Sequence, residues 1–257
     1  MNILALESSA TACSAALCRD GRLIAQSFQC GGLTHSRTLL PMVDDMLKNC
    51  GGALDQVDVV AVAAGPGSFT GLRIGVATAK GLAWAGGKPC APCSTLESMA
   101  WPLAHMEGKL IVCAMDARRK QVYNALFRGR GGRLERLSPD RAISLEELGA
   151  ELKNFLEEKI VVGDGAQLCY NTLREEVSGL ALAPVHLRTQ SAWGVARAAE
   201  ELAASGGLVS GAELAPVYHR LSQAERERLE RERATEIAGP TEIDSSHNDL
   251  QGVDKHV

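Results

Sequence analysis

The residues best suited to chemistry lie in a glycine-rich segment at positions 65–71, with the sequence GPGSFTG. The segment follows a short β-branched apolar run at 57–64 and precedes a long apolar run at 72–86, which predicts a buried strand, a turn and a buried helix. Free N–H groups at the start of such a helix attract anions. However, no lysine follows the glycines as in a phosphate-binding loop. A nucleophile elbow, G-x-S-x-G, would need glycines two residues before and two residues after Ser68, where this chain has Pro66 and Thr70. The spacing therefore favours a tight packing turn over an anion site.

The spacing of histidines and cysteines gives little support for metal or thiol chemistry. No two of the six histidines are spaced to share a helix face, as the ligands of an H-x-x-x-H pair would be. Cys90 and Cys93 form a single C-x-x-C before a predicted helix, a pattern that could act in redox exchange or supply half of a zinc site. Because no second C-x-x-C accompanies it, we predict two buried thiols and no metal site.

The elements that must position these residues follow from the apolar patterns. Strands are predicted at 2–7, 12–18, 22–29, 57–64, 110–115, 121–127 and 159–165, and helices at 39–47, 72–86, from Ser94, from Ser144, at 166–177 and at 191–205. Pro41 lies inside the first helix, which should therefore kink or start late. Both halves open with strands and continue with helices, which predicts an α/β protein with an N-terminal lobe at 1–108 and a C-terminal lobe at 109–221. Mixed charge without an apolar period predicts a disordered tail at 222–257.

The composition fits a cytoplasmic protein without a membrane segment. The 257 residues allow a sizeable core, and the net charge of −4 gives no general attraction to a polyanion, so any RNA contact must be local or supplied by a partner. The eight cysteines are scattered through apolar segments, as expected for reduced thiols. No basic leader and no apolar run of membrane-spanning length is visible.

Several motifs together resemble the TsaB (YeaZ) family, a subunit of the bacterial machinery that makes threonylcarbamoyladenosine in tRNA. The most specific are MNILALESS at 1–9, ACSAAL at 12–17 and GPGSFTGLRIGVATAKGLA at 65–83, with further matches at Leu40–Val43, Ser94–Glu97, Met115–Arg118 and Ala215–Tyr218. The resemblance runs from Met1 to about Leu221. It implies the two-lobed, actin-like ATPase fold of sugar kinases, with a reduced second lobe.

The resemblance also allows the chain to be compared with TsaD, the catalytic sister subunit, which has a histidine–x–x–x–histidine metal pair. That pair would fall at Thr95 and Met99 of this chain, and neither side chain suits iron or zinc. The catalytic metal site is therefore expected to be absent.

A degenerate nucleotide cleft is implied by the same fold. Its members would be Glu7, Ser8, Ser9, Gly65, Gly67, Ser68, Asp116 and Arg118. Glu7 replaces the usual aspartate of the first hairpin, and residues 116–120, with the sequence DARRK, stand where glycines would let backbone approach phosphate. We therefore expect no productive ATP hydrolysis and no bound cofactor.

A partner-facing seam is predicted on the first two helices. It comprises Leu39, Leu40, Met42, Val43, Met46 and Leu47 of the first helix and Gly75 and Ala79 of the second. The apolar stripe on the first helix is wider than a surface helix requires. The alternative is that both helices are sandwiched inside their own lobe. The resemblance implies that these helices pair with TsaD or with a second copy of the chain.

The expected function is that of a non-catalytic dimerisation and scaffold subunit, with TsaD and the ATPase TsaE as partners and with tRNA bound mainly through the complex. The basic segment 128–136 could contact tRNA phosphates, although an exposed turn explains it as well. Two alternatives are a nucleotide-dependent kinase of the same fold and a glycoprotease-like peptidase. The role of the tail cannot be predicted from its residues.

Overall fold

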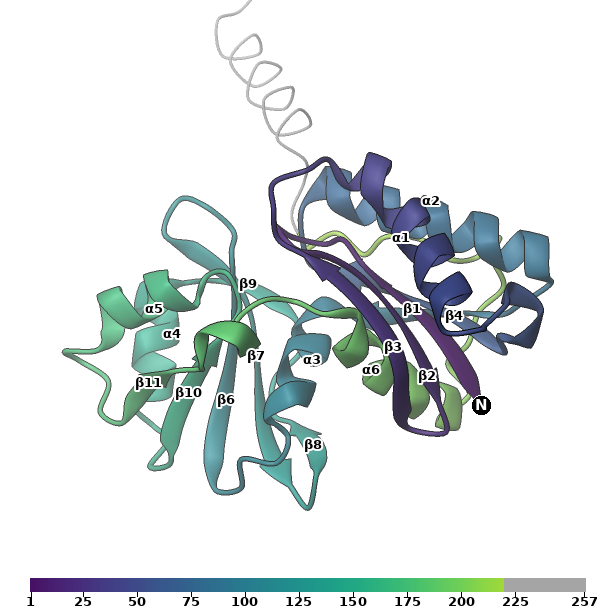
Figure 1. The fold of residues 1–257 in the computed structure, drawn as a ribbon. Coiled ribbons are helices and arrows are strands. Elements are labelled where there is room, and N and C mark those ends of the chain that lie inside the picture. Colours follow the sequence, from purple (N-terminus) through teal and green to yellow (C-terminus); the bar gives the residue numbers. More distant parts are fainter. Residues whose placement is uncertain (220–257) are drawn as a thin grey trace, which may run out of the picture. The chain divides into compact units, whose positions relative to one another are not determined.

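A computed structural model describes residues 1–219 of the chain, which form one compact unit (Figure 1). The predicted tail at 222–257 lies outside the described residues. None of the helices in the described part is long and apolar enough to cross a membrane.

The first sheet has the strand order β3-β2-β1-β4-β5. Its strands are β1 (Asn2–Glu7), β2 (Cys13–Arg19), β3 (Arg22–Gln29), β4 (Val59–Gly65) and β5 (Cys90–Ser94). β1, β2 and β3 pair antiparallel, whereas β4 and β5 run parallel to β1. The central strands are apolar on both faces because both faces of this sheet are covered by helices.

The second sheet repeats this topology. Its strands are β6 (Lys109–Asp116), β7 (Gln121–Arg130), β8 (Arg133–Arg136), β9 (Arg141–Ser144), β10 (Glu158–Val162) and β11 (Leu180–Leu182). The order is β11-β10-β6-β7-β8, and β9 also pairs with β7. β6 and β7 are antiparallel, and β10 and β11 run parallel to β6, as β4 and β5 do to β1. The predicted α/β fold is thus confirmed, and its two sheets share one strand topology.

Two helices cover one face of each sheet (Figure 1). These are α1 (His35–Asn49) and α2 (Phe69–Gly86) on the first sheet, and α4 (Leu145–Leu152) and α5 (Ala166–Leu173) on the second. Side chains alternate along β1, so that Leu4 and Leu6 pack toward α1 and α2 while Ile3 and Ala5 pack on the opposite face. α1 begins at His35 and runs through Pro41, so of the two predicted alternatives, a kink or a late start, the late start is wrong.

The two remaining helices, α3 (Thr95–Ala100) and α6 (Ala192–Ala204), lie between the sheets, and each packs on the sheet of the other half (Figure 1). Leu96 and Met99 of α3 join the core under the second sheet, and Val195 of α6 joins the core under the first. Gly194 brings α6 against α3, because a Cβ there would strike the carbonyl oxygen of Ser98. The predicted lobes at 1–108 and 109–221 would assign α3 to the first half and α6 to the second. In the structure α3 packs on the second sheet and α6 packs on the first, so the two helices are exchanged between the halves.

Candidate functional site: a packed cleft

The glycine-rich segment forms the end of β4 and the start of α2, as its pattern predicts. Ser68 is the N-cap of α2, and its hydroxyl accepts a hydrogen bond from the N–H of Gly71 at 3.4 Å. The N–H of Ser68 donates to the carbonyl oxygen of Ser9 at 2.7 Å, which ties the segment to the first hairpin. The N–H groups of Ser68 and Gly71 are therefore both bound within the protein.

The glycines of this segment are required because other backbone lies against them. A Cβ on Gly67 would lie 2.5 Å from the carbonyl oxygen of Ser9, and a Cβ on Gly71 would strike the carbonyl oxygen of Ser8. The carbonyl oxygen of Val217, in the segment that follows α6, occupies the corresponding place at Gly65. These glycines therefore form a packing turn.

Glu7, at the end of β1, is fully buried behind this turn. Its Oε1 accepts a hydrogen bond from the N–H of Ser9 at 2.6 Å, and its Oε2 has no partner among residues 1–219. Burial raises the pKa of Glu7 from 4.5 to about 7, and the nearby carboxylate of Asp164 adds to the rise. Burial therefore favours the neutral form of this carboxyl.

Asp164 and Gln190 complete the polar interior of the cleft, and neither was predicted from the sequence. Gln190 is buried and donates from Nε2 to Oδ1 of Asp164 at 3.2 Å. Burial raises the pKa of Asp164, and the charge of Asp116 adds to the rise. The signal for Asp164 was its place between Gly163 and Gly165 directly after a parallel strand, since the carboxyl ends of β1, β6 and β10 meet along this cleft.

The second half closes its own glycine turn in the same way. A Cβ on Gly163 would strike the carbonyl oxygen of Ala114, and one on Gly165 would lie 2.9 Å from the nitrogen of Asp116. The other predicted cleft residues of this half, Asp116 and Arg118, are exposed on the loop between β6 and β7. The structure thus brings Glu7, Ser8, Ser9 and the first glycine turn together but leaves Asp116 and Arg118 at the surface.

The metal and thiol positions are also enclosed. Thr95 and Met99 are buried in α3, and residues 1–219 contain no group of three or more His, Cys, Asp or Glu residues that could hold a metal ion. Cys90 and Cys93 are buried free thiols of β5, and burial raises the pKa of both. A raised pKa lowers the thiolate fraction, which disfavours redox exchange.

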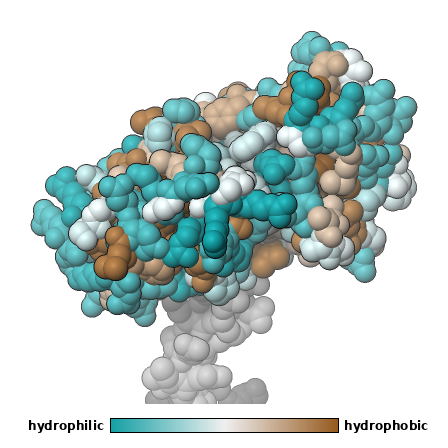
Figure 2. Space-filling model, turned by 90° about the horizontal axis from the view of Figure 1, so that it is seen from below, coloured by the Kyte–Doolittle hydropathy of each residue, from teal (hydrophilic) through white to brown (hydrophobic). Residues whose placement is uncertain are grey.

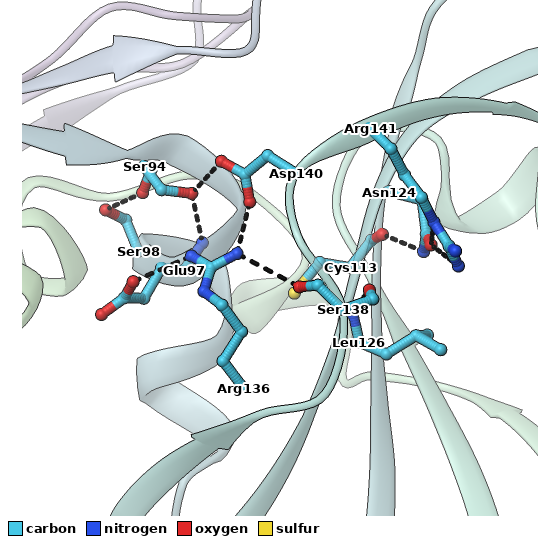
Figure 3. Close-up of polar contacts among 10 residues, drawn as sticks. All are labelled: Ser94, Glu97, Ser98, Cys113, Asn124, Leu126, Arg136, Ser138, Asp140 and Arg141. Carbon is cyan, nitrogen blue, oxygen red and sulfur yellow. Dashed lines mark hydrogen bonds and ion pairs between the residues drawn. The ribbon is translucent and has the colours of Figure 1, made fainter.

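A polar network fastens α3 to the second sheet (Figure 3). Arg136 donates to Oδ1 of Asp140 at 2.6 Å and to Oε2 of Glu97 at 2.9 Å. Ser94, the N-cap of α3, donates from its hydroxyl to Oδ2 of Asp140 at 2.5 Å. The network therefore joins the end of β5 and the start of α3 to the segment that follows β8.

The basic hairpin between β7 and β8 is partly neutralised. Arg128 pairs with Glu157 at 2.5 Å and with Glu135 at 3.5 Å, whereas Arg130 and Arg133 are exposed. On the face seen from below in Figure 2, hydrophobic side chains lie scattered among hydrophilic ones.

The predicted seam on α1 and α2 is mostly internal. Leu39, Met42, Val43, Met46 and Leu47 of α1, and Gly75 and Ala79 of α2, are buried in the core between these helices and the first sheet. Only Leu40 is exposed, at 51%. The wide apolar stripe is explained by packing within the chain for every member except Leu40.

Comparison with known proteins adds to this geometry. The family model "TsaD: tRNA N6-adenosine threonylcarbamoyltransferase" matches residues 31–217. The chain is 34% identical to the tRNA threonylcarbamoyladenosine biosynthesis protein TsaB of Bacillus subtilis over 90% of this chain and 99% of that protein. It is 33% identical to the Escherichia coli TsaB over 86% of this chain and 95% of that protein.

Solved structures agree with these matches. YeaZ from Pseudomonas aeruginosa aligns with a TM-score of 0.69 and 28% identity, covering 84% of this chain and 99% of that one. A second Pseudomonas aeruginosa structure, described as similar to peptidase YeaZ, aligns with a TM-score of 0.73 and 27% identity, covering 85% and 99%. From its sequence relatives and its fold together, the chain belongs to the TsaB family.

Proposed function

We propose that this chain acts in tRNA threonylcarbamoyladenosine biosynthesis as a non-catalytic subunit that binds and supports TsaD, with TsaE as a further partner. The names of the Bacillus and Escherichia relatives support the pathway, and the match to the TsaD family model supports TsaD, a chain of related fold, as the partner.

The observation that carries the non-catalytic role is the packed glycine turn. Carbonyl oxygens of Ser8, Ser9 and Val217 lie against Gly71, Gly67 and Gly65, so these glycines serve the close packing of backbone. The N–H of Ser68, at the N-cap of α2, is bound to the carbonyl oxygen of Ser9. This arrangement argues against the kinase alternative and leaves binding to a partner as the use of the fold.

The exposed face of α2 is the best candidate for the partner surface. Trp84 is 89% exposed, and Arg73, Ala77 and Gly81 are exposed on the same side of the helix. Glycine in a helix interior costs about 1 kcal/mol relative to alanine, yet a Cβ on Gly81 would meet nothing within 4 Å. Close approach of another chain would explain this glycine. Together with Leu40 of α1, these residues replace the buried seam as the proposed interface.

The test is reconstituted threonylcarbamoyl transfer to an unmodified tRNA, with TsaE and ATP present. Activity is compared for this chain alone, cognate TsaD alone and the two together. We expect activity only in the mixture, and we expect Leu40→Glu to reduce it at least tenfold because a charge would be buried at the interface. Leu156→Glu is the matched control, since Leu156 is also an exposed leucine but follows α4.

Gel filtration of the mixture separates loss of assembly from loss of chemistry. Transfer by this chain without TsaD would overturn the non-catalytic role. A fully active TsaD that gains nothing from this chain would overturn the supporting role. An effect of Leu156→Glu equal to that of Leu40→Glu would remove the interface from α1 and α2. Elution of the free chain as a dimer that Leu40→Glu dissociates would show that copies of this chain use the same surface.

A further inference from the structure

The loop between β6 and β7 contains an unusual run of backbone conformations. Arg118, Arg119 and Lys120 have φ values of 62°, 55° and 58°, and all three residues are exposed. Residues with a long side chain adopt this left-handed conformation rarely, because Cβ crowds the following carbonyl oxygen. Three in succession need support from the surrounding structure, and such support is typical of segments that clamp a ligand.

The support is provided at both ends of the loop. Oδ1 of Asp116 accepts a hydrogen bond from the N–H of Arg118 at 2.7 Å, and the carbonyl oxygen of Arg118 accepts from the N–H of Gln121 at 3.1 Å. The carbonyl oxygen of Lys120 accepts from the N–H of Leu145, the first residue of α4, at 3.1 Å. We call residues 118–120 the basic turn. Its backbone is fixed before any ligand binds.

The three cationic side chains of the basic turn have no carboxylate partner in the described part of the chain. In the same half, Arg128 pairs with Glu157 and Arg141 pairs with Glu151. Within residues 1–219, none of the three side chains of the basic turn takes part in an ion pair or hydrogen bond, and the nearby Asp116 uses Oδ1 to bind backbone. The turn thus presents three adjacent cations on a chain whose net charge is −4.

We propose that the basic turn binds phosphates of an RNA backbone, so that this subunit itself contacts the tRNA; the inference rests on the proposed function. Arginine guanidinium groups bind phosphate oxygens in a bidentate manner, and contacts to backbone phosphates need only positioned cations. A free nucleotide would need an enclosing pocket. The three residues of the basic turn are exposed, which suits contact with the phosphates of a polymer at the surface.

The test measures binding of an unmodified tRNA as a function of KCl concentration, for the complex with cognate TsaD and for this chain alone. The variant is Arg118→Asn/Arg119→Asn, because asparagine tolerates the left-handed region and should keep the shape of the turn. The matched control, Arg22→Asn/Arg174→Asn, removes the same charge from exposed positions outside both the basic turn and the basic segment 128–136. Thermal unfolding confirms that both variants are folded.

We expect the variant to bind tRNA roughly tenfold more weakly at physiological salt and to lower the slope of log K against log[KCl] by about 1.5, as two lost phosphate contacts require. The control should match the wild type. An unchanged slope in the variant, or an equal loss in the Arg22→Asn/Arg174→Asn control, would overturn the inference. So would loss of assembly with TsaD at unchanged RNA affinity, because the turn would then face an acidic protein surface.

Binding of a nucleotide is distinguished from binding of RNA with ATP as the probe. ATP binding that disappears in the variant while the tRNA slope stays the same would assign the turn to a nucleotide and contradict an RNA contact. Failure of the proposed function has a different signature, because a chain that neither assembles with TsaD nor supports transfer fails before RNA is added. In that case the titration of this chain alone still decides whether the basic turn binds RNA.

Discussion

Glu7 is a carboxylic acid enclosed by its own chain, and the free energy of enclosing it depends on pH. Its pKa is about 7 in the folded protein and 4.5 as the reference value of an exposed carboxyl. Below pH 4.5 the group is neutral in both the folded and the unfolded states. Between pH 4.5 and 7 the unfolded chain releases a proton that the folded chain retains, so stability falls as pH rises. A shift of this size corresponds to about 3 kcal/mol in the free energy of unfolding.

The substitution Glu7→Gln should remove this dependence. We expect the free energy of unfolding of the variant, relative to the wild type, to increase by about 3 kcal/mol between pH 4.5 and pH 7.5. Urea denaturation across this range measures the difference, in which other titrating groups largely cancel. Glu146→Gln, at an exposed position in the first turn of α4, controls for loss of a carboxylate. A difference that stays constant with pH would contradict the burial argument.

The position of Glu7 in a cleft could be predicted from the sequence, but its enclosure could not. The residue pattern gives the end of a strand and a polar turn, which fits an open nucleotide site as well as a closed one. Closure depends on Ser9 and Val217, which are far apart in the chain and act through backbone oxygens that leave no side-chain signal. The pairing of Asp164 with Gln190 was missed because the two side chains are far apart in the chain.

The glycines of α2 serve two different purposes, although they lie in one helix. Gly71 faces the carbonyl oxygen of Ser8, whereas Gly81 faces open space. Gly71→Ala should therefore lower the free energy of unfolding by about 3 kcal/mol, because backbone must move to admit the methyl group. Gly81→Ala should raise it by about 0.5–1 kcal/mol, since alanine is the better helix former.

Urea denaturation of the two alanine variants measures both effects, and each variant serves as the control for the other. Equal destabilisation by both would contradict the assignment of Gly81 to an open face. Weaker binding of TsaD by Gly81→Ala, despite the higher stability of the variant, would support the proposed use of that face.

For α1 the sequence predicted the helix and its apolar stripe but not what covers the stripe. The sequence pattern of an apolar stripe is the same whether the stripe packs on a sheet or on another protein. In the structure Leu39, Val43 and Met46 are buried against the first sheet, and Leu40 is the one residue of the predicted stripe that is exposed to a partner. A stripe wider than a simple surface helix needs is therefore weak evidence for an interface when a sheet and a second helix are both available.

The exchange of α3 and α6 makes the two halves depend on each other for folding. The core under the first sheet contains Val195 and Ala196 of α6, and the core under the second contains Leu96 and Met99 of α3. Fragments 1–108 and 109–219 should each fail to show a cooperative thermal transition, because each exposes the apolar face that the missing helix covers. Circular dichroism of the fragments, separately and mixed, checks this expectation.

A cooperative transition in fragment 1–108 alone would contradict the dependence, and recovery of the transition on mixing would support it. The sequence predicted the helices and the longer strands of both halves because their apolar runs are strong and well separated, but it missed the short strands β5, β8, β9 and β11. It did not predict the exchange, since the apolar residues of α3 and α6 do not specify which sheet each helix covers.

The contact between Gly194 and Ser98 has a consequence for how the two halves can diverge in evolution. The helices approach so closely that a methyl group on Gly194 would meet the carbonyl oxygen of Ser98. A larger residue in the second half can therefore be accommodated only if the first half shifts its backbone. Although the halves share little sequence, a substitution at this crossing changes the packing of both halves. The evolution of the two halves is therefore coupled at this contact.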